Sequence, residues 1–188
     1  MSLYSIAVFL HVVGALGLFA GVGLEQTGLR GLRGASTGAQ VREGVLVLRR
    51  LRRIEEPTGL VILATGCYML AVRWGGQPWA GLSLLGMVAM AALGMRLNGR
   101  RVAAIARGIS AVDGTIPSAL QQRLHDPVLL KTANVRAALG LWIVFNMTVK
   151  PGIPLLFAGL GIALVIGWVA GWSSGHHSVP EGRHAIES

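Results

Sequence analysis

The side chains of this chain that could do chemistry lie in apolar runs, and His11 is the first of them. It is the one imidazole that any long apolar stretch contains, and the others are Cys67, Met87, Met90 and Asn146. Imidazole binds haem iron and most transition metals, while thiols and thioethers suit Cu(I). We therefore consider His11, Met87, Met90 and Asn146 as cofactor-binding residues, and His11 with Cys67 as metal ligands.

These residues must be positioned by helices in a membrane. The 188 residues are 53% hydrophobic and 13% charged, whereas charged residues make up about a quarter of ordinary soluble domains. The stretch 3–24 has no charged residue, and about 20 such residues cross the roughly 30 Å hydrocarbon core as a helix. The first apolar stretch lacks a basic leader and a cleavage site, so we expect a retained span.

The same pattern recurs along the chain and predicts an all-α, polytopic transmembrane helix bundle with five spans. Glycines between 25 and 40 predict a polar loop after the first span, and Pro57 predicts the first turn of the second. Short turns join the second span to the third, as an antiparallel hairpin, and the fourth to the fifth. The predicted spans are 3–24, 57–74, 78–96, 132–150 and 153–172, with basic segments at 25–56 and 97–131 and a polar tail at 173–188.

The basic residues predict the orientation. Of the 17 lysines and arginines, seven fall in 25–56, seven between Arg96 and Arg136, and one in the tail, whereas Arg73 and Lys150 fall on the other side. By the positive-inside rule, the N-terminus is outside, the C-terminus is cytoplasmic, and the location is a bacterial inner membrane. The formal net charge of +9 then indicates anionic lipid headgroups as a partner rather than nucleic acid. A solvated basic face that only fixes topology is the alternative.

Among the basic residues within the predicted spans, Arg136 lies farthest from an end of its span. Arg136 falls near the start of the fourth span, where its side chain can reach the inner interface. We predict an ion pair there between Arg136 and Glu25, Glu55 or Glu56. The spacing leaves the choice among the three carboxylates open.

The predicted orientation also gives the depth of each polar residue. At 1.5 Å per residue, His11 lies about 12 Å from the outer end of its span. By the same count Cys67, Ser83 and Asn146 fall in the outer half of the membrane. If they face one another, they form a small polar site with methionines beside it. The alternative is that each side chain bonds to its own or the next helix.

Three groups of short motifs resemble a family. They are Leu10-His11 with Phe19-Ala20-Gly21, then residues 49–54 leading to Pro57 and Thr65-Gly66, and finally residues 147–151. They are similar to the superfamily of small bacterial membrane proteins that includes copper-resistance D-type domains and small haem-containing protoporphyrinogen oxidases. The resemblance implies that His11 is a haem ligand. Leu18 replaces the oxidases' tryptophan and the third span lacks their lysine, so the member family of unassigned function fits best.

Three functions remain open on these residues. The first is a b-type haem or other redox site centred on His11, with Met87 or Met90 as the second ligand. The second is a site for copper or another soft metal, with His11, Cys67 and the methionines as ligands. The third is a non-enzymatic structural, accessory or transport role, in which glycines spaced by four residues, as in 17–21 and 167–171, allow oligomerisation.

Overall fold

The computed structural model describes residues 2–109 and 114–173, and it is all-helical over those residues, with one isolated bridge between Thr37 and Thr115. Nearly all of the predicted tail, 173–188, lies outside them. The α-helices are α1 (Leu3–Arg33), α2 (Gly38–Met69), α3 (Pro78–Ala92), α4 (Arg100–Ile109), α5 (Ser118–Leu124), α6 (Pro127–Val149) and α7 (Ile153–Ser173). Two π-helices, η1 (Leu70–Trp74) and η2 (Leu93–Gly99), extend α2 and join α3 to α4.

Five helical stretches of the described chain are long and apolar enough to cross a membrane, which confirms the predicted fold class at this level. They are Leu3–Arg33, Gly38–Trp74, Pro78–Ile109, Ser118–Val149 and Ile153–Trp172. Several of them are far longer than the roughly 20 residues that a bilayer needs. The bundle therefore continues beyond the apolar stretches at one end. A cluster of buried hydrophobic residues joins α1, α2, α4, α5 and α6 there.

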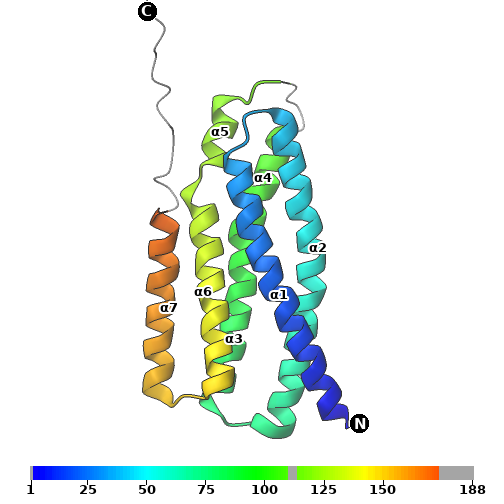
Figure 1. Ribbon diagram of the computed structural model, residues 1–188, viewed down its shortest axis with the longest axis vertical. Helices are drawn as coiled ribbons and strands as arrows, with labels where there is room; N and C mark the ends of the chain where they lie inside the picture. The colour runs from blue at the N-terminus through cyan, green and yellow to red at the C-terminus, as the bar shows by residue number, and fades with distance from the viewer. Residues whose placement is uncertain (1, 110–113, 174–188) are drawn as a thin grey trace, which may run out of the picture.

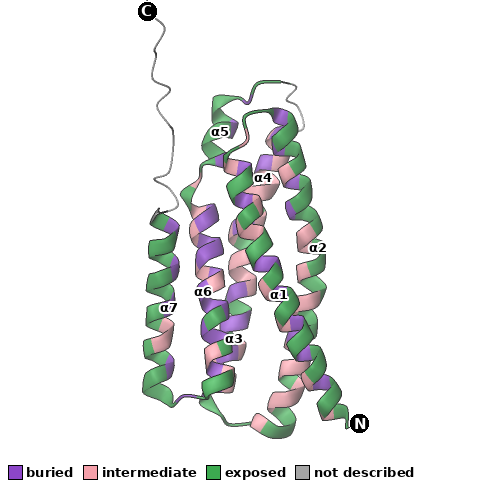
Figure 2. Cartoon of the chain, in the orientation of Figure 1, coloured by how far each residue is buried: buried purple, intermediate pink, exposed green. Residues whose placement is uncertain are grey.

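Helix α6 is the centre of the bundle. It packs against α1, α3, η2 and α7, and it carries more buried residues than the other helices (Figures 1 and 2). Helix α7 packs mainly on α6 at the edge, and most of its surface is exposed (Figure 2). Its apolar outer surface is what a helix in contact with lipid requires.

The expected loop after the first span is wrong, because α1 continues as a helix to Arg33. Gly28 in that stretch is a packing position, as are Gly14 and Gly21 earlier in α1: a Cβ at any of the three would lie 2.7–2.8 Å from a side chain of α2. These glycines are seven residues apart and so are their partners, which keeps one side of α1 against α2. The pairs are Gly14 with Ile62, Gly21 with Glu55, and Gly28 with Leu48.

Pro57 does not begin a helix, which corrects a second expectation. Helix α2 begins after Thr37, whose hydroxyl accepts from the Gln40 amide at 3.3 Å in a capping box, and Pro57 lies inside it. Proline removes one backbone donor, yet the helix continues through this turn, where α2 packs along α1.

Lysines held on tryptophan rings mark both ends of α6. The Lys131 ammonium lies 4.8 Å from the Trp168 ring centroid, and that of Lys150, the residue after α6, lies 4.1 Å from the Trp74 ring centroid. The two lysines are 19 residues apart, or about 28 Å of helix. That separation matches the roughly 30 Å hydrocarbon core, whose interfaces favour such aromatic and basic residues.

Helices α2 and α3 are antiparallel and joined by a short turn, but they pack on each other little. Helix α3 contacts mainly α6, while α2 contacts mainly α1. Two pockets lie along the seam between α2 and α3, and Leu63 and Met87 line both of them. Residues of η1 line one pocket and residues of η2 the other, and π-helical turns are frequent at functional sites.

Candidate functional site

The first of these cavities, which we call the His11 pocket, lies at the end of the bundle that carries the N-terminus. It measures about 410 Å³, and its walls are mostly apolar and aromatic. Its side chains come from α1, α2, η1, α3 and α6. The lining side chains that could bind a metal or a polar ligand are His11, Met69, Met87, Met147, Ser83 and Lys150. The aromatic walls are formed by Tyr4, Trp74 and Trp79.

A hydrogen bond to the neighbouring helix orients His11. Its ring is buried, with 8% of the residue exposed, and its Nδ1 lies 3.0 Å from the Thr65 hydroxyl. That hydroxyl donates its single hydrogen to the Val61 carbonyl at 2.7 Å, so it accepts from His11. This hydrogen-bond pattern assigns the proton to Nδ1, which makes Nε2 the nitrogen with a lone pair for a metal or a proton.

Gly66 allows the imidazole to approach α2. A Cβ at this position would lie 3.3 Å from the His11 Cε1, which is tighter than most Cβ contacts in proteins. The Thr65-Gly66 pair therefore supplies both the hydrogen bond and the space for His11.

The structure brings together some of the predicted site residues and separates others. Met87 lines the same pocket as His11, whereas Met90 lines the second pocket. Cys67 is exposed and does not line the His11 pocket. Asn146 is fully buried, but it lies outside the pocket lining. His11 is thus placed with methionines rather than with Cys67 or Asn146.

Two buried polar side chains near this pocket lack partners within the described residues. They are Ser83, which is 1% exposed and lines the pocket, and Asn146, whose amide oxygen and nitrogen are both unpartnered. Buried polar groups are normally hydrogen-bonded, so an unpartnered hydroxyl in a pocket wall indicates a ligand or water there.

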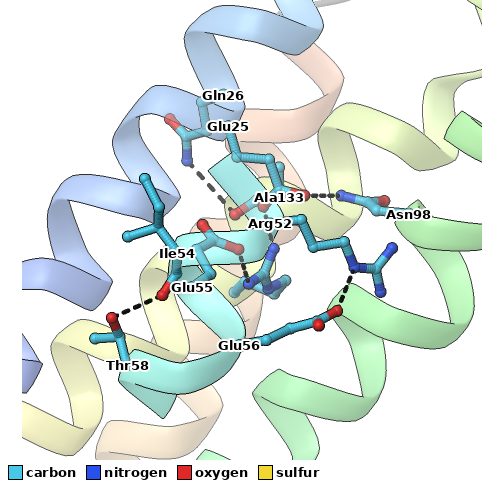
Figure 3. Close-up of polar contacts among 10 residues, drawn as sticks. Glu25, Gln26, Arg52, Ile54, Glu55, Glu56, Thr58, Asn98 and Ala133 are labelled. Carbon is cyan, nitrogen blue, oxygen red and sulfur yellow. Dashed lines mark hydrogen bonds and ion pairs between the residues drawn. The ribbon is translucent and has the colours of Figure 1, made fainter. Parts of the chain in front are cut away.

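The second cavity, the Arg136 pocket, lies along the seam toward the basic end and measures about 500 Å³. Arg136 of α6 is bonded through Nη1 to Glu25 of α1, and its Nη2 lies 3.6 Å from Glu55 of α2. The Asn98 amide of η2 donates to Glu25 at 3.1 Å, as Figure 3 shows. Of the three carboxylates predicted for Arg136, Glu56 instead pairs with Arg52 at 3.2 Å (Figure 3).

Two glycines of η2 allow arginines to reach this network. A Cβ at Gly94 would lie 2.8 Å from the Arg136 guanidinium carbon, and one at Gly99 would lie 2.6 Å from that of Arg52. Sequence reasoning missed Gly94, Asn98 and Gly99. The signal that could have found them is the run Gly94–Gly99, in which an asparagine and two glycines continue an apolar helix.

Comparison with known proteins gives no family for this chain. It matches no family model, no curated protein and no solved structure.

Proposed function

We propose that this protein is a multi-pass inner-membrane protein that holds a redox cofactor, haem b, in the His11 pocket. The observation that carries the proposal is the buried His11, whose hydrogen bond to Thr65 leaves Nε2 free inside a membrane-embedded pocket. An intramembrane histidine is costly and is a functional-site hypothesis by default.

The residues of the pocket fit this group. His11 would hold the group through its imidazole, and Met87 in the same lining would offer a thioether. The volume of about 410 Å³ is in the range of small-molecule sites and far exceeds the space of a bare ion. Aromatic walls suit a flat apolar ring, and Lys150 is available to an acidic substituent. Bound haem would supply one-electron transfer, and the resemblance of the first-span motif supports the same residue as ligand.

Copper is the second candidate, because the structure gathers a soft donor set. Met69, Met87 and Met147 line the pocket together with His11, and thioethers with imidazole suit Cu(I). Cys67, which is exposed elsewhere on α2, does not belong to this set.

An absorption spectrum of the protein purified in mild detergent, oxidised and then reduced with dithionite, tests the haem proposal. We expect a Soret band that sharpens on reduction and is lost in His11→Ala. Met87→Leu should shift the band, whereas Met90→Leu, in the other pocket, should leave it unchanged. His125→Ala is the matched histidine control. His125 is exposed at the C-terminal end of α5, and its Nδ1 bonds to the backbone carbonyl of Gln121.

Metal analysis of the same samples separates the candidates. A colourless protein with bound copper that is lost in His11→Ala would favour the copper site over haem. A colourless, metal-free protein in all preparations would contradict both and leave a non-enzymatic structural, accessory or transport role.

We further propose the orientation given by the charges, with the N-terminus outside and the basic end facing anionic lipids of the cytoplasmic leaflet. Ser36 and Gln77 lie in exposed turns at opposite ends of the bundle. In a Cys67→Ser background, an impermeant maleimide added to whole cells should label Gln77→Cys and not Ser36→Cys. The reverse pattern would show the opposite orientation.

A further inference from the structure

The Arg136 pocket contains an acceptor atom without a donor. Asn98 is 2% exposed and lines the pocket, and its Nδ2 donates to a Glu25 oxygen at 3.1 Å. Because a carboxylate only accepts, the amide nitrogen must face Glu25, which identifies Oδ1 as the remaining atom. Oδ1 is buried and lacks a partner within the described residues. A buried amide oxygen of this kind calls for an N–H or O–H donor in the pocket.

The charges around this atom favour a cationic donor. Two carboxylates, Glu25 and Glu55, share the single guanidinium of Arg136, and each acidic side chain is 13% exposed. Among the described residues, the acceptor Glu55 Oε1, beside Gly21, and the donor Arg136 Nε are also buried without a hydrogen-bond partner. Arg52 and Glu56, also in the lining, compensate each other at 3.2 Å. With both carboxylates ionised, the buried residues Glu25, Glu55 and Arg136 therefore carry one negative charge in excess, whereas Arg49, the other charged residue of the lining, is exposed. Desolvated charges are costly unless compensated.

The position of the pocket favours an amphiphile as the source of that cation. Arg136 is five residues, or about 8 Å of helix, from the interfacial Lys131. The pocket is open on one side, and its apolar walls, including Leu60 and Met90, lead from the charged cluster toward the middle of the bundle. Arg49 in the same lining is exposed and available to an anionic group.

We propose that the Arg136 pocket binds the head of a phosphatidylethanolamine-type phospholipid, with its primary ammonium donating to Asn98 Oδ1 beside the excess carboxylate. Its phosphate pairs with Arg49, and its acyl chains follow the apolar wall. A primary ammonium matches both observations at once, since it carries the missing charge and has three hydrogen-bond donors. Phosphatidylcholine has the same charge but no N–H, so it tests the donor separately. This proposal does not depend on a cofactor in the His11 pocket.

Native mass spectrometry of the full chain, titrated with phosphatidylethanolamine and phosphatidylcholine of identical acyl chains, tests the proposal. We expect about tenfold tighter binding of phosphatidylethanolamine, which corresponds to one charge-assisted hydrogen bond. The preference should be lost in Asn98→Leu and reduced in Glu55→Gln. Glu43→Gln, an exposed carboxylate on the same helix outside the pocket, should keep it. The ratio of the two lipids is read in one sample, so it does not depend on the yield of folded protein.

Two further probes identify the source of the ammonium group. Dodecylamine should compete with phosphatidylethanolamine more weakly, because it lacks the phosphate for Arg49, and Arg49→Gln should remove that difference. Equal retention of phosphatidylethanolamine and phosphatidylcholine would overturn the proposal. Preferential retention of phosphatidylglycerol would also overturn it, since an anionic head cannot compensate the cluster. Dodecylamine binding more tightly than the phospholipid would assign the pocket to a free amine instead.

Discussion

The two pockets along the α2–α3 seam differ in how their polar side chains are bonded. In the Arg136 pocket, charged and amide side chains from α1, α2, η2 and α6 bond mainly to one another. In the His11 pocket, His11 bonds to Thr65 of the next helix, and the hydroxyl of Ser83 bonds to no described residue. The first arrangement ties four elements together and leaves the Asn98 Oδ1 without a partner in the described chain, whereas the second joins two helices and leaves the Ser83 hydroxyl without one. Polar groups can thus be held by a charged network that joins four elements at one end of the bundle and by a single hydrogen bond at the other.

Of the substitutions that test this comparison, Arg136→Leu should have the largest effect on stability. The substitution leaves Glu25 and Glu55 buried without their shared cation, so we expect a loss of about 3–5 kcal/mol of stability. Thermal unfolding in detergent measures it. Arg53→Leu, at an exposed position of α2, is the control and should change little. Adding Glu25→Gln and Glu55→Gln to Arg136→Leu should recover part of the loss, and an unchanged melting temperature in Arg136→Leu would contradict a structural role for the network.

Gly21→Ala tests the packing under the same network and should have the next largest effect. The added Cβ would lie 2.7 Å from the Glu55 Oε1 and 2.8 Å from its Cγ. We expect a loss of about 1–3 kcal/mol from overpacking, measured by the same unfolding assay. Gly23→Ala has nothing within 4 Å of its Cβ and should instead stabilise the helix by up to about 1 kcal/mol. Equal effects of the two substitutions would argue against the close α1–α2 contact.

Thr65→Val tests the hydrogen bond that orients His11. It removes the hydroxyl that accepts from Nδ1, so we expect a loss of about 1 kcal/mol and weaker retention of the cofactor. Unfolding and the ratio of Soret to protein absorbance measure the two effects. Thr58→Val is the control, because Thr58 makes the same kind of bond to a backbone carbonyl, at 2.8 Å to Ile54, without a histidine. Identical cofactor retention in the two variants would show that Thr65 does not orient His11.

Ser83→Ala should have the smallest effect on the unliganded protein. The hydroxyl is buried without a partner in the described chain, so its removal should change the stability by less than about 1 kcal/mol, in the stabilising direction. In contrast, the variant should bind the pocket's ligand more weakly than the unmodified protein. A destabilisation greater than that of Thr65→Val would show that Ser83 serves packing rather than binding.

The sequence predicted some parts of these sites and missed others for identifiable reasons. Arg136 was expected to meet Glu25, Glu55 or Glu56, and the structure pairs it with the first two. Glu55 and Glu56 are neighbours in sequence but about 100° apart around a helix, so only the rotation of α2 decides between them. Gly28 was expected in a loop because glycine weakens helices, yet its close contact with Leu48 outweighs that tendency.

The sequence by itself determined that this chain has five apolar helices, one strongly basic end and a histidine buried in the first helix. Those properties follow from hydropathy, length and charge, which are local. Only the tertiary structure decided which polar groups meet, because residue spacing gives height along a helix but not the direction in which the side chain points. The glycines of α1, spaced by seven residues, set the rotation and register of α1 against α2. This packing brings His11 to Thr65 and Glu25 to Arg136, and it separates Cys67 from both pockets.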